Sequence, residues 1–182
     1  DIAGISRSPA IFDMAKLDYF NATYLRALPA ETFAQVAEPY IRESVKDPRF
    51  DTAAIASLLQ ARCEKLTDIP EKVDFFDRLP DYDVSSFTNK KSKTNAEISQ
   101  SMLEAVIPVL EALPDWTQES VHDALVGTAE KLGVKNATLM WPVRIAVAGK
   151  LVTPGGAVEL CHILGREETL RRLGLGLEKL RA

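Results

Sequence analysis

The apolar residues of this chain recur at helical spacing along almost its whole length. An amphipathic helix places apolar side chains at i, i+3, i+4 and i+7, whereas a half-buried strand alternates apolar and polar residues. We find no sustained alternation enriched in β-branched residues. The spacing predicts helices over residues 12–27, 30–45, 52–65, 70–79, 96–113, 118–132, 137–148, 155–164 and 167–181. The predicted fold class is therefore all α.

Polar residues at the starts of these segments support the helix assignments. Asp51 precedes TAAIASLL and Thr117 precedes QESVHDAL, so each is predicted to cap a helix. Asp68 stands three residues before Glu71, which is the spacing of a capping box. These signals predict three helix starts.

A polar stretch divides the chain into two parts. Hydrophobic density drops in DYDVSSFTNKKSKTN, residues 81–95, where Ser, Thr, Asn and Lys accumulate. The chain has 182 residues, and 46% of them are hydrophobic, which is enough for a buried core. We predict two successive helical subdomains, residues 1–90 and residues 94–182.

The segment WPVRIAVAGKLVTPGG, residues 141–156, combines an arginine with a predicted helix start. Arg144 falls beside the apolar stripe of a helix that Gly149 can close, and Thr153 and Pro154 are predicted as N-cap and first residue of the next helix. Free N–H groups at a helix start and a guanidinium fork both suit a nucleotide base or phosphate. The alternative is a surface ion pair followed by an ordinary capped turn.

Several blocks of sequence carry a family resemblance. They are SPAIFDMAKLDYFNATYLR at residues 8–26, WPVR at 141–144, the glycine at 149, TPG at 153–155 and ELCHILGREETLRRL at 159–173. In this order and spacing, the chain resembles the C-terminal anticodon-binding region of bacterial-type glutamyl-tRNA synthetases. The resemblance covers essentially the whole chain and is strongest at its two ends.

The resemblance assigns roles to individual residues. Arg144, with the turn at Thr153 and Pro154, is expected to face the first two anticodon bases, and Arg62 the third. Trp141 is expected to support Arg144, although a Trp on an apolar stripe is also a common core residue. The alternative for Arg62 is a helix-surface arginine beside Glu64. The predicted tRNA-binding residues are Arg144, Arg62, Thr153, Pro154, Trp141, Arg166, Arg171 and Arg172.

The distribution of charge is compatible with RNA binding at one end of the chain. The net charge of −4 argues against binding RNA over the whole surface. Residues 141–182, however, hold seven Lys or Arg and four Glu, a net charge of +3. Arg166, Arg171 and Arg172 are therefore predicted to contact phosphates, with a solvated charged face as the alternative.

The sequence predicts neither a catalytic residue nor a metal site. Cys63, Cys161, His122 and His162 are isolated from one another in sequence, so the two thiols are expected in the core. KKSKT at residues 90–94 resembles the KMSKS loop of class I synthetases. It follows the segment at 8–26, whereas the family's loop precedes it, and that loop needs an α/β nucleotide-binding domain. We interpret it as a polar linker with occasional phosphate contacts.

The resemblance also implies partners and cofactors. It implies binding to the anticodon loop of glutamate tRNA and a catalytic domain that precedes Asp1. This chain is expected to hold no cofactor, while ATP and Mg²⁺ would serve the whole enzyme, a monomer. We find no membrane-spanning run and no signal peptide, so we expect a cytoplasmic location.

Two other classes of function remain open. The first alternative is an acidic helical protein-interaction module that holds a partner peptide in a groove. Its binding would respond little to salt, whereas RNA binding would weaken steeply. A stand-alone helical enzyme ranks last, because we find no activated nucleophile in the sequence.

Overall fold

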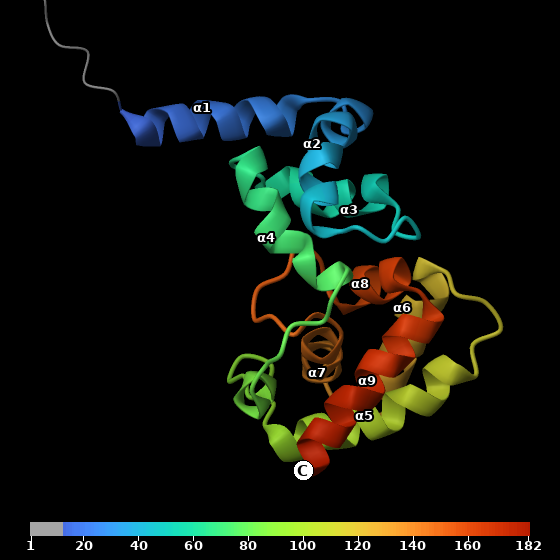
Figure 1. Cartoon of the computed structure of the whole chain (residues 1–182). Helices are drawn as coiled ribbons and strands as arrows, with labels where there is room; N and C mark the ends of the chain where they lie inside the picture. The colour runs from blue at the N-terminus through green and yellow to red at the C-terminus, as the bar shows by residue number, and fades with distance from the viewer. Residues whose placement is uncertain (1–12) are drawn as a thin grey trace, which may run out of the picture.

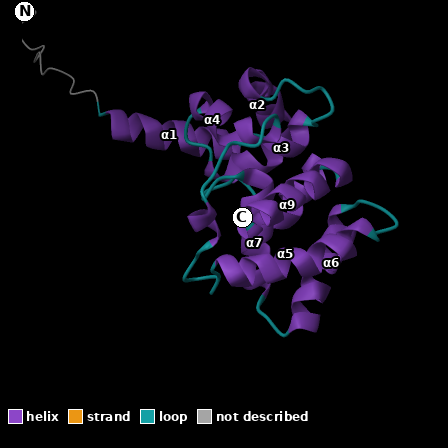
Figure 2. Cartoon of the chain, turned by 60° about the horizontal axis from the view of Figure 1, so that its bottom comes forward, coloured by secondary structure: helices purple, strands orange, loops and turns teal. Residues whose placement is uncertain are grey.

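The computed structural model describes residues 13–182, and its regular structure is helical. The α-helices are α1 (Met14–Ala27), α2 (Ala30–Ser44), α3 (Thr52–Leu59), α4 (Ile69–Val73), α5 (Ala96–Glu111), α6 (Gln118–Leu132), α7 (Asn136–Ala148), α8 (Ala157–Leu164) and α9 (Arg166–Arg181). Short 3-10 turns lie at Gln60–Arg62, Leu66–Asp68, Asp74–Phe76 and Val84–Phe87. Figure 2 shows no strand in the described part of the chain. The predicted all-α fold is confirmed.

The helices form two groups, which we name the first lobe (α1–α4) and the second lobe (α5–α9). In the first lobe α2 packs against α3 and α4, and in the second lobe α7 contacts α5, α6, α8 and α9 (Figure 1). Helix α7 is buried around most of its circumference, with Leu139, Val143, Ile145 and Val147 fully covered. Helix α7 is therefore the centre of the second lobe. None of the described helices is long and apolar enough to cross a membrane.

The segment predicted to link the subdomains packs against the second lobe. Its 3-10 turn at Val84–Phe87 contacts α5 and α7. The Trp141 indole donates to the Ser86 carbonyl at 3.0 Å, and the Thr138 hydroxyl donates to the Ser92 carbonyl at 2.8 Å. The division at residues 90 and 94 stays a prediction, and these contacts favour an earlier boundary.

Two of the predicted helix caps are present and one is wrong. The Asp51 carboxylate accepts from the Ala53 amide, and Thr117 forms a capping box with Ser120. Asp68 makes no side-chain cap at α4. Its backbone is already helical, with φ −84° and ψ −12°. A capping residue needs an extended backbone for its side chain to accept a hydrogen bond from the amides that follow it.

Two helices are shorter in the structure than the sequence predicted. In the segment 52–65, α3 ends at Leu59 and a 3-10 turn follows to Arg62, where the extended backbone of Cys63 ends the helical structure. The segment 70–79 is α4 followed by a second 3-10 turn that ends at Phe76. The expected start of α1 at residue 12 lies outside the described residues.

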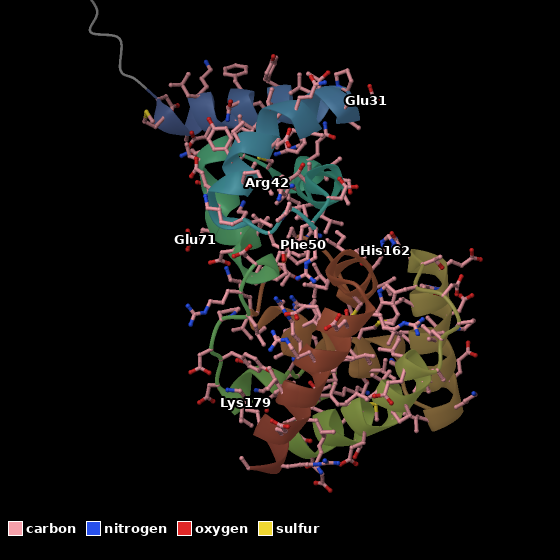
Figure 3. The ribbon with its side chains drawn as sticks, turned by 45° about the vertical axis from the view of Figure 1, so that its right-hand side comes forward. Glu31, Arg42, Phe50, Glu71, His162 and Lys179 are labelled. Atoms are coloured by element: carbon pink, nitrogen blue, oxygen red, sulfur yellow. The ribbon has the colours of Figure 1, made fainter. Side chains whose placement is uncertain are left out.

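Arg42 fixes the loop that leads into α3. Its guanidinium donates to the carbonyls of Val45, Asp47 and Phe50, the last two at 3.0 Å. In Figure 3 Phe50 lies near the junction with the second lobe, and Arg42 lies above it in the first lobe. These bonds set the start of α3, whose C-terminal end and following turn border the groove described below.

Helices α7 and α9 approach closely at Gly176. A Cβ atom at this position would lie 2.8 Å from the Ala146 Cβ, and both residues are buried. We expect Gly176→Ala to lower the free energy of unfolding by about 1–3 kcal/mol through overpacking, measured by urea denaturation. Gly174 has no atom within 4 Å of its added Cβ. Gly174→Ala should therefore be neutral or stabilising, and equal losses in the two variants would contradict the close-packing explanation.

Candidate nucleic-acid interface

A groove of about 570 Å³ lies between the two lobes. One wall comes from the end of α3 and the turn after it, and the other from α7, α8 and the loop that joins them. The lining residues are Leu58, Arg62, Arg144, Leu151, Val152, Thr153, Pro154, Gly155, Gly156 and Glu159. The structure thus brings together Arg62, Arg144, Thr153 and Pro154, four of the residues predicted to bind tRNA.

Arg144 is held in place by the loop that follows its helix. Its guanidinium donates to the Thr153 hydroxyl and to the Leu151 carbonyl, each at 2.8 Å. The guanidinium carbon lies 4.7 Å from the centre of the Trp141 ring, within the range of a cation–π contact. Trp141 therefore packs against Arg144, as the sequence interpretation expected. Two of the five guanidinium donors of Arg144 are fixed, and its position in the groove is set.

The loop does not begin the next helix where the sequence predicted. Gly149 ends α7 in the left-handed conformation with φ 63°, as expected. Helix α8, however, starts at Ala157 after Gly156, so the assignment of Thr153 as N-cap and Pro154 as first helical residue is wrong. The Thr153 hydroxyl is occupied elsewhere, since it accepts from Arg144 and donates to the Gly155 carbonyl at 2.6 Å.

Arg144 carries its charge without a matching carboxylate in the described part of the chain. Burial lowers the pKa of its guanidinium, and no acidic group opposes that shift. Glu159 lines the same groove but forms no ion pair with either groove arginine among the described residues. A half-buried cation without a counter-charge favours an anionic or acceptor-rich ligand.

Arg62 faces Arg144 across the groove from the first lobe. It ends the 3-10 turn at Gln60–Arg62 and is exposed. Within residues 13–182 its guanidinium has no hydrogen bond or ion pair, so the expected alternative pairing with Glu64 is absent there. Its donors are available to a ligand.

A family model described as "Anticodon binding domain" matches residues 32–177. The chain belongs to this family. The anticodon-binding domain is 46% identical over 182 residues to a glutamate–tRNA ligase of Clostridium tetani, and 42% identical over 180 residues to that of Clostridium acetobutylicum. These alignments cover 100% and 99% of the domain, and 37% of each relative.

A solved structure shares the fold. The crystal structure of a glutamate tRNA ligase from Elizabethkingia meningosepticum, in complex with its amino acid, aligns with a TM-score of 0.73 at 25% identity. The match covers 93% of the anticodon-binding domain and 33% of that chain. The domain therefore spans about a third of the length of the proteins that it matches.

Arg172 of the domain is a structural residue, and its predicted contact with phosphate is wrong. Its side chain is 1% exposed. It donates to the carbonyls of Phe75 and Val147 at 2.6 and 2.7 Å, to that of Phe76 at 3.1 Å, and to Glu168 at 2.6 Å. A guanidinium with these partners and no solvent exposure cannot reach RNA. Arg172 instead joins α9 to α7 and to the first lobe.

Arg166 and Arg171 lie on α9, and neither lines the groove. Arg166 stacks over Trp116 and bonds the Leu113 carbonyl, while Arg171 forms a two-point ion pair with Glu168. This pair is the largest cause that lowers the pKa of the Glu168 carboxyl, to about 2. A phosphate contact of either arginine remains a prediction.

The residues predicted to bind tRNA did not include Lys150, Leu151 or Val152. Lys150 reaches from the α7–α8 loop to the first lobe, where it bonds the Glu71 carbonyl at 2.6 Å and pairs with Asp74. Leu151 and Val152 are 58% and 83% exposed at the groove. The sequence did contain a signal for the two apolar residues: they occur in a short loop near Arg144, whereas a solvated loop is usually polar.

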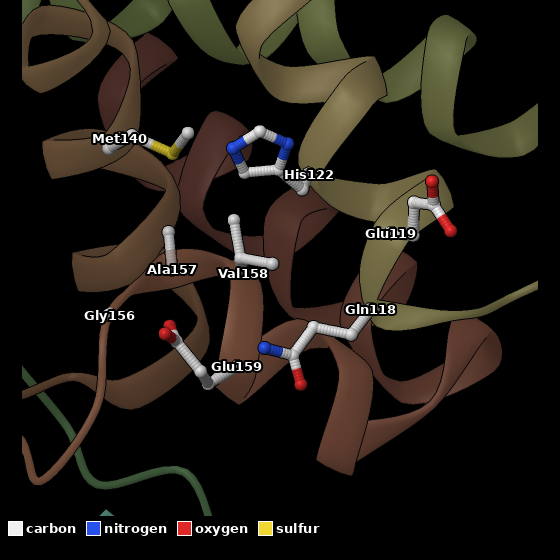
Figure 4. A pocket seen from close by; sticks show the side chains of 8 residues that line it. All are labelled: Gln118, Glu119, His122, Met140, Gly156, Ala157, Val158 and Glu159. Carbon is white, nitrogen blue, oxygen red and sulfur yellow. The ribbon is translucent and has the colours of Figure 1, made fainter.

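A second hollow of about 560 Å³ lies between α6 and α8 and suits RNA poorly. Figure 4 shows His122, Met140 and the carboxylates of Glu119 and Glu159 around it. It has no Lys or Arg in its lining, so a phosphate would meet two acidic groups. Among residues 13–182 no group of three His, Cys, Asp or Glu side chains is placed to hold a metal ion.

The two cysteines are free and buried, which confirms the prediction of core thiols. Burial raises the pKa of Cys161 to about 12. Cys63 borders a small cavity of about 110 Å³ beneath Arg62 and Pro154. We expect Cys63→Ala to reduce the free energy of unfolding by about 1 kcal/mol, seen as a melting temperature lower by roughly 2–4 °C, with unchanged RNA selectivity. An altered base preference would place Cys63 in the recognition surface instead.

Proposed function

We propose that this anticodon-binding domain recognises the anticodon loop of glutamate tRNA as part of a glutamate–tRNA ligase. The observation that carries the proposal is the pair of arginines, Arg62 and Arg144, on opposite walls of one groove. Single-stranded RNA is read by splaying its bases and hydrogen-bonding their exposed edges. Two planar cations from different lobes supply such donors on two sides of an inserted loop.

Arg144 is the principal base-reading residue in this proposal. Its remaining N–H groups face acceptors on a base edge, while the bonds to Thr153 and Leu151 keep the fork from rotating. Trp141 packs against the guanidinium of Arg144, and the turn at Thr153 and Pro154 forms part of the groove wall. Arg62 reads a different base from the first lobe. Arg166 and Arg171 contribute phosphate contacts outside the groove.

The proposal extends to the whole enzyme. Ligation of glutamate to tRNA would take place in a separate catalytic domain that uses ATP and Mg²⁺, and that domain would be the second partner of this chain. We place the enzyme in the cytoplasm and propose that it acts as a monomer.

The test is a fluorescence titration of the 182-residue chain at low salt with two RNA stem-loops that share one stem. One carries the glutamate anticodon, and the other has its three anticodon bases scrambled. Tighter binding of the glutamate stem-loop is expected. Equal affinity for both would overturn anticodon recognition by this chain, and salt-insensitive binding of a peptide would favour the protein-interaction module.

A further inference from the structure

The lysine-rich loop KKSKT is folded against the second lobe. The backbones of Asn89 and Thr94 exchange two hydrogen bonds, at 3.1 and 3.0 Å, which closes the loop at its base. The Asn89 side chain accepts from the Ser92 amide at 2.9 Å, and the buried Thr138 of α7 donates to the Ser92 carbonyl. Ser92 and Thr94 are buried. The loop is therefore fixed at the N-terminal end of α7.

This fixed loop directs its charged side chains into solvent. Lys90, Lys91 and Lys93 are exposed, and so is Lys135, which immediately precedes α7. None of these four lysines forms an ion pair within residues 13–182. Lys93 and Lys135 border one open hollow of about 630 Å³, where Glu97 is the acidic neighbour. We name Lys90, Lys91, Lys93 and Lys135 the lysine surface.

Helix α7 connects the lysine surface to the groove. Lys135 and Arg144 are nine residues apart, which is about 14 Å along a helix axis. Between them Trp141 contacts both Arg144 and Ser86, a residue of the segment that leads into the lysine loop. The α7–α8 loop and the green segment before α5 lie on the same side of the second lobe (Figure 1). An RNA strand bound in the groove thus has a second cationic surface about 14 Å away, a distance of about four nucleotides along one strand of a duplex.

We propose that the lysine surface binds the sugar-phosphate backbone of the RNA stem next to the loop held in the groove. The inference rests on the proposed function and adds a contact that carries no sequence information. Lysines act as point charges on phosphates and displace condensed counterions, whereas base reading requires the fixed forks of Arg62 and Arg144. The surface would orient the stem while the groove reads the loop.

The test compares charge-removing variants of the 182-residue chain. Lys90→Gln/Lys91→Gln removes two positive charges from the lysine surface. Lys16→Gln/Lys46→Gln removes two from exposed positions of the first lobe and serves as the matched control. Each protein is titrated from low to moderate salt with both stem-loops and with the isolated loop oligonucleotide that lacks a stem.

Loss of the Lys90 and Lys91 charges is expected to weaken both stem-loops equally. The slope of log affinity against log salt should become shallower by about 1.5, because each phosphate contact contributes about 0.7–0.9. Preference for the glutamate anticodon and affinity for the isolated loop should not change. A slope equal to that of the control variant, or a matching loss with the isolated loop, would overturn the proposal.

The two proposals fail in different ways. If the unmodified chain binds both stem-loops equally, anticodon recognition fails, while a shallower slope in the Lys90 and Lys91 variant still supports the lysine surface. If the chain prefers the glutamate stem-loop and the slope stays the same, the lysine surface fails alone. Absence of RNA binding at low salt overturns both.

Discussion

Alanine in place of Arg172 is expected to lower the free energy of unfolding by about 3–5 kcal/mol. The substitution leaves the carbonyls of Phe75, Phe76 and Val147 buried without their donors, and each unsatisfied group costs about 1–3 kcal/mol. It also leaves a void the size of a large side chain at the junction of α9, α7 and the first lobe. Urea denaturation followed by circular dichroism measures the loss.

Arg171→Ala is the matched control for this prediction. Arg171 is the neighbouring arginine and pairs with the same Glu168, but its side chain is 53% exposed. An exposed ion pair contributes about 0–1 kcal/mol, so the variant should unfold almost like the unmodified domain. Similar losses in the two variants would show that the stability comes from the ion pairs with Glu168 and not from the buried carbonyl contacts.

Arg144→Ala is expected to weaken binding of the glutamate stem-loop by about 1–3 kcal/mol and to relax discrimination at one anticodon base. The affected base should be the one whose substitution no longer matters to the variant. Titration against stem-loops changed at one anticodon position at a time identifies it. Equal losses for every loop sequence would instead assign Arg144 to a phosphate.

Thr153→Val tests whether base reading by Arg144 depends on the hydrogen bond that fixes its guanidinium to the α7–α8 loop. It removes the hydroxyl that accepts from Arg144 but keeps the guanidinium and a side chain of similar shape. If base reading needs the fixed fork, this variant should lose part of the discrimination that Arg144→Ala loses. If Thr153→Val instead abolishes binding as fully as Arg144→Ala does, the order of the loop, and not the arginine, dominates the effect.

The helical fold was readable from spacing, because burial in each helix repeats with the helical period. The same helical spacing indicated that position 172 is buried, but an arginine at this position was interpreted as a surface residue. Thr169, Leu173 and Gly176 are buried on α9, and Arg172 lies on their face, whereas Arg171 points outward. The sequence could not indicate the hydrogen-bond partners of Arg172. These partners are backbone carbonyls, which every residue has, and they come from distant segments.

The groove illustrates a similar limit. Helical spacing placed Arg144 beside an apolar stripe, but it could not bring Arg62, from the other lobe, to the same cavity. That expectation came from family resemblance. The Thr153 error has a local cause, because a threonine before a proline is a good cap by composition, yet its hydroxyl has a stronger competing partner in the Arg144 guanidinium.

The bond from Arg172 to the Phe75 carbonyl joins residues that are 97 positions apart. A ribosome adds about 5–20 residues per second, so roughly 5–20 s separate the synthesis of these two residues. Throughout that interval the Phe75 carbonyl lacks the donor that Arg172 supplies in the folded chain. Helix α9 thus completes the seam between the lobes, so this contact between them can form only after α9 has been made.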